Sequence, residues 1–176
     1  MALPISNKVC FTSKCAPNIV LVYAGRYKVN GIQQSTVFDS SSFRITSIIR
    51  GSIRMQNPKY SKSRNAVPLI HTTNLKKGEL SNLRNIIVER NILVTGNGVV
   101  IPRVCNPNVQ KIALLDENKT YALSDCVIVL RTETKTDAEK LRDGIIKHWG
   151  NFVSVYKGTG AQYTTLERLK TLFRVT

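Results

Sequence analysis

Short runs of valine, isoleucine and leucine follow one another between residues 67 and 130, and turn-forming residues separate them. The runs occupy residues 67–71, 86–88, 92–95, 99–101, 111–115 and 126–130. Runs this short have the length and composition of β-strands and are too short for helices. The middle of the chain therefore has to build a sheet. Pro68 has no main-chain N–H to donate, so we expect the 67–71 strand at a sheet edge.

The residues between these runs have turn and loop composition. Gly96-Asn97-Gly98 supplies two residues that accept a positive φ, and residues 74–78 and 116–119 are polar. Upstream, residues 43–49 fit either a strand or a short helix that ends at Gly51. Residues 54–66 are polar and basic and are expected to form a cationic loop.

Two helical segments are expected after the strands. Residues 138, 141, 145 and 149 are apolar at helical spacing, and Thr136 or Asp137 is a suitable N-cap. Gly150 is expected to end this helix. The sequence Thr164-Thr-Leu-Glu167 has the pattern of a capping box with Thr164 as the cap, and it opens a last short helix. The inward positions of that helix are expected at Leu166, Leu169 and Leu172 or Phe173.

The first 38 residues form a separate segment in this interpretation. Residues 19–23 predict one strand that ends at Gly25, and residues 27–29 predict a second. Two short strands cannot bury a face of their own, so this segment should pack on another part of the chain or on a partner. Residues 39–176 are then predicted to form an α+β domain. We expect a small, mixed, mostly antiparallel sheet, curved like a barrel, with two C-terminal helices.

The charge of the chain is strongly positive. Lys and Arg number 26 against 11 Asp and Glu, the formal net charge is +15 and the isoelectric point is about 10.0. A domain this basic is expected to bind an anionic polymer, and nucleic acid is the main candidate. The alternative is charge that serves solubility or faces an acidic protein partner.

The cysteines and histidines do not suggest a metal site. Cys10, Cys15, Cys105 and Cys126 form no C-x-x-C pair, and two histidines are present in the whole sequence. Cys126 lies at the start of an apolar run and is expected to be buried. No signal peptide and no stretch of membrane-helix length is visible. We therefore expect a reduced, cytoplasmic protein that does not contact a membrane.

Catalytic patterns are weak in this sequence. No nucleophile–histidine arrangement follows from the spacing, and neither Gly-rich turn has the spacing of a phosphate-binding or dinucleotide loop. One alternative is a nuclease fragment of the PD-(D/E)xK type, in which Glu133 and either Asp116 or Asp125 would bind Mg²⁺ and the set with Lys135 would position a water molecule. However, residues 132–137 fit better as the polar entry to a helix. Mg²⁺-dependent cleavage that is lost on changing Glu133 would distinguish this alternative.

Several motifs in a fixed order resemble the target-recognition domains of type I restriction specificity subunits. They are Arg44-Ile-Thr-Ser-Ile-Ile-Arg-Gly-Ser52, Val67-Pro-Leu-Ile-His-Thr-Thr-Asn-Leu-Lys-Lys-Gly-Glu-Leu80, residues 92–104 and residues 122–131. Residues 156–170 are similar to the end of specificity domains of TaqI-like adenine-N6 DNA methyltransferases. The resemblance covers about 130 residues, and it implies sequence-specific binding of double-stranded DNA for restriction and modification.

The resemblance also implies what this chain lacks. Residues 17–23 look like the last strand of an N6-methylase catalytic domain, which makes the chain a part of a larger enzyme or a split subunit. The family's catalytic tetrapeptide, Asp-Pro-Pro-Tyr or Asn-Pro-Pro-Tyr, is absent from the sequence. We therefore expect no methylation and no cofactor in this chain alone. S-adenosylmethionine would bind the implied catalytic domain, which would be the protein partner.

The predicted DNA contacts fall into two groups. Phosphate contacts are expected from Arg50, Arg54, Lys59, Lys62, Arg64, Lys76, Lys77 and Lys157. Base contacts are expected from Asn74, Asn97, Arg103 and Gln162, because Arg pairs with guanine and Asn or Gln with adenine in the major groove. Asn97 and Gln162 have alternative roles as a turn residue and a helix-capping residue. A further alternative function is RNA binding, which would need exposed aromatic side chains on a sheet face.

Overall fold

The computed structural model of the protein describes residues 42–56, 58–88 and 93–175. All of them belong to the unit Gln33–Thr176. The strands predicted at 19–23 and 27–29 and the boundary predicted at residue 38 lie outside the described residues, as do Cys10 and Cys15.

A four-stranded antiparallel sheet, here called the central sheet, has the order β1-β10-β7-β8. Its strands are β1 (Ile45–Arg50), β7 (Gly98–Pro102), β8 (Ala113–Leu114) and β10 (Val127–Thr132). Alternate residues of β10 enter two different cores. Ile128 and Leu130 pack with the helices, whereas Val127 and Val129 pack with the second sheet. A strand that is buried on both faces has to be apolar throughout, which explains the unbroken apolar run in the sequence.

The second sheet, here called the outer sheet, has the order β5-β2-β9-β6. Its strands are β2 (Val67–Ile70), β5 (Arg84–Ile86), β6 (Leu93–Thr95) and β9 (Thr120–Leu123). β2 and β9 are parallel, and the other pairs are antiparallel. A small hairpin of β3 (Leu75–Lys76) and β4 (Glu79–Leu80) and two 3-10 turns, η1 (Thr72–Asn74) and η2 (Val109–Lys111), lie in the connections.

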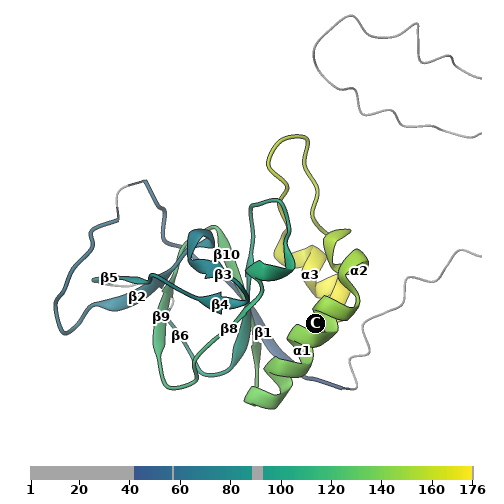
Figure 1. Ribbon diagram of the computed structural model, residues 1–176, viewed down its shortest axis with the longest axis horizontal. Helices are drawn as coiled ribbons and strands as arrows, with labels where there is room; N and C mark the ends of the chain where they lie inside the picture. Colours follow the sequence, from purple (N-terminus) through teal and green to yellow (C-terminus); the bar gives the residue numbers. More distant parts are fainter. Residues whose placement is uncertain (1–41, 57, 89–92, 176) are drawn as a thin grey trace, which may run out of the picture. The chain divides into compact units, whose positions relative to one another are not determined.

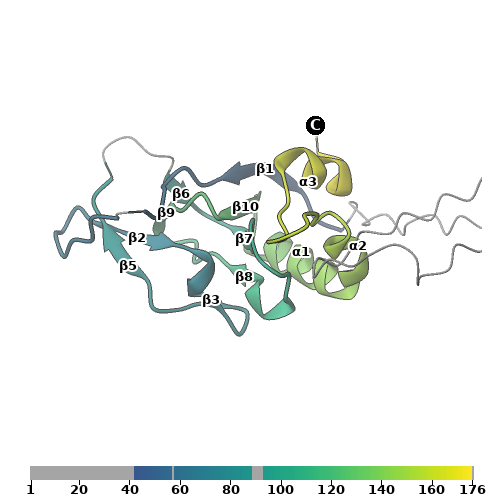
Figure 2. The same ribbon diagram turned by 90° about the horizontal axis from the view of Figure 1, so that it is seen from above.

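Three helices cover the face of the central sheet that the outer sheet leaves free (Figures 1 and 2). They are α1 (Lys135–Lys147), the short α2 (Trp149–Val153) and α3 (Leu166–Phe173). Leu141, Ile145, Phe152 and Leu169 are fully buried against the sheet. The predicted α+β class, the mostly antiparallel pairing and the two C-terminal helices are confirmed, with α2 added between them. Within the described ranges the sheets do not close into a barrel.

Two expectations about the strands are wrong. β2 lies between β5 and β9 and is not an edge strand. Pro68 is tolerated because β2 pairs with β9 only at Leu69 and Ile70, after the proline. Strand β9 was not expected, because residues 120–123 include polar Thr120 and follow directly on a loop. The alternative left open for residues 43–49 is settled as a strand, β1.

The predicted helix boundaries are also wrong by small amounts. Thr134, not Thr136 or Asp137, caps α1, because its hydroxyl oxygen accepts the N–H of Asp137 at 3.1 Å. Gly150 lies inside α2, which the buried Phe152 anchors to the core. Thr165 replaces Thr164 as the cap of α3, because the Thr165 hydroxyl oxygen accepts the N–H of Arg168 at 3.3 Å.

Candidate nucleic-acid interface

One end of the central sheet brings Arg50 and Arg103 together. Arg50 is paired with Ile128 near the start of β10, and Pro102, which precedes Arg103, is paired with Val127. Both guanidinium groups act electrostatically on Cys126 and lower the pKa of its thiol, although burial has the larger, opposite effect and raises it. Cys126 is half-buried and not buried as predicted, because it precedes β10 at this open end.

The outer sheet ends on the same side through His71 and Ser124. The Nδ1 atom of His71 lies 2.9 Å from the hydroxyl oxygen of the buried Ser124, and this contact joins the ends of β2 and β9. Ile53 forms a parallel bridge with Ser124, which places Arg54 beside this contact. Burial lowers the pKa of His71, while Asp125 acts in the opposite direction.

Two neighbouring loops extend from this end, one after β7 and one after α2 (Figure 1). Tyr163 pairs with Val104 and with Lys157, and the N–H of Cys105 donates to the carbonyl oxygen of Gln162 at 3.0 Å. Gly158 makes the second loop tight, since a Cβ there would lie 2.8 Å from the carbonyl oxygen of Ala161. Lys157 and Gln162 are therefore carried beside the chain that follows Arg103.

Buried Tyr156 fixes the second loop to the central sheet. Its hydroxyl donates to the carbonyl oxygen of Pro102 at 2.5 Å, and burial raises its pKa. This hydrogen bond therefore ties the start of the second loop to the end of β7, just before Arg103.

The loop of residues 71–82 is organised by Asn74. Its Oδ1 atom accepts the N–H of His71, and its Nδ2 atom donates to the carbonyl oxygens of Ser81 and Asn82 at 3.0 and 2.9 Å. These bonds leave the exposed Lys76 and Lys77 near the tip of the hairpin. The hairpin is held against η2, because the N–H of Gly78 donates to the carbonyl oxygen of Gln110 at 2.8 Å.

We call this side of the protein the cationic end. It consists of Arg50, Arg54, Lys76, Lys77, Arg103, Lys111 and Lys157. In the part of the chain that the structure describes, the ion pairs within 4.0 Å are Lys119–Asp116 and Arg142–Asp143, and neither involves the cationic end. Cations that lack an acidic partner remain free to bind an external anion.

Several acidic side chains lie at the other end of the sheets, whereas Asp125 lies at the cationic end and Glu79 is paired with Lys76 in the β3–β4 hairpin. Asp116 and Glu117 precede β9, whereas Glu133 and Asp137 follow the far end of β10. Asp116 is close enough to Lys135 to be affected by its charge. The segment 42–111 holds twelve Lys and Arg against two acids, whereas 112–143 holds five against seven. The excess of positive charge therefore lies in the segment 42–111, which supplies all the cations of the cationic end except Lys157.

A second group of cations lies on the loop that precedes β2. Lys59, Lys62 and Arg64 are exposed, and the loop runs along the edge strand β5. Its attachment is made by a Tyr60–Ile86 bridge and by the N–H of Ser61, which donates to the carbonyl oxygen of Asn85 at 2.9 Å. The predicted cationic loop is confirmed as a loop.

The structure groups the predicted contact residues unequally. Arg50, Arg54, Lys76, Lys77, Arg103, Lys157 and Gln162 lie at the cationic end, and Lys59, Lys62 and Arg64 lie on the loop beside β5. Asn74 is engaged in its own loop. Asn97 lies at the opposite end of β7 from Arg103, and its amide points to the carbonyl oxygen of Glu133 at 3.4 Å. Sequence reasoning missed Lys111, Arg84 and Tyr60, although Tyr60 stood inside the basic loop.

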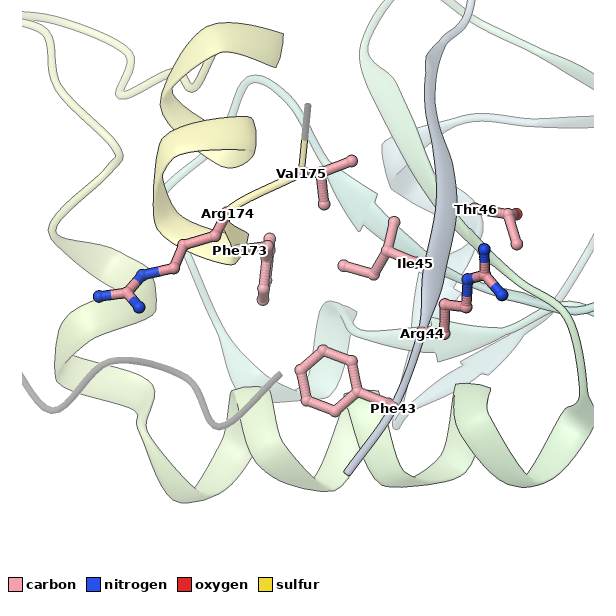
Figure 3. A pocket seen from close by; sticks show the side chains of 7 residues that line it. All are labelled: Phe43, Arg44, Ile45, Thr46, Phe173, Arg174 and Val175. Carbon is pink, nitrogen blue, oxygen red and sulfur yellow. The ribbon is translucent and has the colours of Figure 1, made fainter. Parts of the chain in front are cut away.

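A separate hollow lies between the start of β1 and the end of α3 (Figure 3). Phe43, Ile45 and Phe173 turn toward one another there, whereas the side chains of Arg44 and Arg174 extend away from them. The side chains that turn into this hollow are thus apolar, and we do not include it in the interface.

The residues of the nuclease alternative do not form a metal site in the described part of the chain. Asp125 and Glu133 lie beyond opposite ends of β10, and Lys135 is the first residue of α1. Asp116 is held by Lys119 at 2.9 Å. Across residues 42–56, 58–88 and 93–175, three or more Cys, His, Asp or Glu side chains do not come together in a group that could hold a metal ion. In the same ranges, no helix has the length and apolar character needed to span a membrane.

Comparison with known proteins does not assign a family. No protein-family model matches the sequence, and no curated protein matches it significantly. The resemblance to target-recognition domains remains a prediction from the motifs.

Proposed function

We propose that this chain binds double-stranded DNA in a sequence-dependent way, as the target-recognition part of an adenine-N6 methyltransferase system. The observation that carries the proposal is the cationic end, where both sheets and two projecting loops contribute Lys and Arg without acidic partners in the described part of the chain. Such a surface suits the phosphate backbone, which provides most of the affinity of DNA-binding proteins.

Phosphate and base contacts are assigned to different residues. Arg50, Arg54, Lys76, Lys77 and Lys157 at the cationic end, and Lys59, Lys62 and Arg64 on the neighbouring loop, would bind phosphates. Arg103 and Gln162 would reach base edges, since they lie where the two adjacent loops leave the sheet. Asn74 is left out because its amide is occupied, and Asn97 because it lies at the other end of β7.

Methyl transfer would belong to the partner. The chain has no catalytic tetrapeptide, so S-adenosylmethionine and the reacting adenine would be bound by a catalytic domain or subunit outside the described residues. The proposal implies action on DNA in the bacterial cytoplasm.

Paired substitutions at the two ends test the proposal. Fluorescence anisotropy with a labelled random duplex would compare the Arg50→Ala, Lys76→Ala double variant with a matched Lys135→Ala, Lys140→Ala control on α1. The first pair should weaken binding and lower the slope of log affinity against log salt by about 2, and the control should change little. Equal losses in both pairs would contradict the assigned interface. Tighter binding of an RNA hairpin than of the duplex would favour the RNA-binding alternative.

A further inference from the structure

Tyr60 is an exposed aromatic residue beside the interface. Its side chain is 38% exposed, whereas Phe43, Phe152 and Phe173 are buried. The bridge to Ile86 places Tyr60 on the edge of the outer sheet. The small apolar cluster of the outer sheet consists of Leu69, Ile86 and Ala122 with partly buried neighbours, and Tyr60 is not a member of it. Packing in the core therefore does not explain an aromatic ring at this position in the basic loop.

Arg84 lies over the ring of Tyr60, with its guanidinium carbon 3.8 Å from the ring centre. A guanidinium at this distance stacks on the ring, and among the described residues it has no acidic partner within 4.0 Å. Tyr163, the other exposed tyrosine in the described ranges, differs from it. There Arg168 lies 5.3 Å from the ring centre and donates to the carbonyl oxygen of Tyr163, which fixes the loop.

A hollow of about 490 Å³ opens beside the Tyr60–Arg84 pair. It is lined by Tyr60, Ser61, Lys62, Leu83, Arg84 and Asn85. The ring and the guanidinium offer flat surfaces to another flat group, the Asn85 amide and the Ser61 hydroxyl can bond polar edges, and Lys62 can bind an anion. A planar heterocycle with polar edges and a neighbouring phosphate has this combination of features, and a nucleotide base is such a group.

A second hollow connects this pair to the cationic end. Tyr60 and Arg84 line it together with His71, Thr73 and Lys76. This hollow therefore gives a nucleic-acid strand bound at the cationic end a path to the pair.

We propose that Tyr60 and Arg84 form a stacking site for an unpaired base of the bound DNA. The base has to be unpaired because the faces of bases inside a duplex are covered by their neighbours, so only a bulged, flipped or single-stranded base can stack on protein. The inference rests on the proposed DNA binding and adds a ligand class to it, namely duplex DNA with an extrahelical base.

The test compares two duplexes of the same sequence, one fully paired and one with a single bulged 2-aminopurine, whose fluorescence falls when it stacks. The wild-type protein should bind the bulged duplex more tightly and should change the fluorescence of the probe. Tyr60→Leu should weaken binding of the bulged duplex by about 5-fold to 150-fold and leave the paired duplex almost unaffected. Tyr60→Phe should behave like the wild type, because it keeps the ring. Tyr163→Leu is the matched control and should not affect the preference.

Salt-dependent binding of both duplexes without a preference for the bulge, or a preference that survives Tyr60→Leu, would overturn this inference and leave the proposed DNA binding intact. Failure to bind either duplex would overturn both proposals. Thermal unfolding of each variant would separate loss of the ring from loss of the fold.

Discussion

Arg103 donates a hydrogen bond from Nε to the main-chain oxygen of Asp125, 2.5 Å away. The main-chain N–H of Arg103 also donates to the carbonyl oxygen of Cys126 at 2.7 Å, and its own carbonyl oxygen accepts the N–H of Thr164 at 3.0 Å. The residue is thus fixed between the turn before β10 and the chain that enters α3. A main chain fixed on both sides and a side chain anchored through Nε can present the guanidinium in a constant position, as base recognition requires.

Substitution of Arg103 by Gln should relax sequence preference at one base position. The loss of a bidentate guanidinium–guanine contact should reduce discrimination at that position by about 1–3 kcal/mol. Selection of bound duplexes from a random pool, followed by sequencing, would measure the preference at each position. An unchanged preference in the variant would show that Arg103 does not read a base.

Substitution of Lys62 by Ala should weaken the binding of all sequences alike. Lys62 is exposed and has no acidic partner in the described ranges, so its contact with DNA would be with a phosphate. The slope of log affinity against log salt should decrease by about 1. Lys135→Ala on α1 is the matched control and should leave the slope unchanged. A sequence-dependent effect of Lys62→Ala would assign the residue to base reading instead.

The free energy of unfolding should fall in mild acid because of His71. Burial lowers the pKa of His71 below its usual 6.5. Below about pH 6.5, His71 of the unfolded chain binds a proton, whereas His71 of the folded protein binds it only at a lower pH. Folding therefore becomes less favourable as the pH falls from about 6.5 toward the lowered pKa of the folded protein. His71→Gln should remove this component. Denaturant unfolding at about pH 7.5 and about pH 5.5 would measure it, and identical pH dependence in the two proteins would contradict it.

Two glycine substitutions should have opposite effects on stability. A Cβ at the buried Gly51 would lie 2.0 Å from the carbonyl oxygen of Ser124, so Gly51→Ala should destabilise the protein by about 1–3 kcal/mol or more. A Cβ at Gly150, inside α2, would meet no atom of the other described residues within 4 Å, apart from its chain neighbours and the backbone of its own helix. Gly150→Ala should therefore stabilise the protein by about 0.4–1 kcal/mol. Thermal unfolding would measure both changes, and a stable Gly51→Ala variant would contradict the close packing of β1 on the outer sheet.

The strands and helices could be predicted where one residue pattern determines them. β7 and β10 are buried on both faces and appear as unbroken apolar runs, and α1 repeats its apolar residues at helical spacing. The position of β2 could not be predicted in this way. Pro68 favours an edge position for β2. However, β2 lies inside the sheet because β9 pairs with Leu69 and Ile70, beyond the proline, and β9 is distant from β2 in the sequence.

The candidate site could be predicted in part for a similar reason. Exposed Lys and Arg in a polar loop are visible in the sequence, so Lys59, Lys62 and Arg64 were found. The grouping of Arg50 with Arg103 depends on the pairing of β10 with both β1 and β7, which no local pattern reveals. Asn74 was predicted to read bases because it is a polar residue in a loop. Its side chain instead forms hydrogen bonds within residues 71–82, and these depend on a loop fold that the sequence does not reveal.

Binding of duplex DNA at two salt concentrations tests the central claim most directly. Fluorescence anisotropy with a labelled random duplex at about 50 mM and about 200 mM salt would compare the affinities. If six or more of the assigned cations bind phosphates, the affinity should fall by roughly 10³-fold or more between these conditions. Binding that is absent, or that does not change with salt, would contradict the assignment of this protein as a reader of DNA.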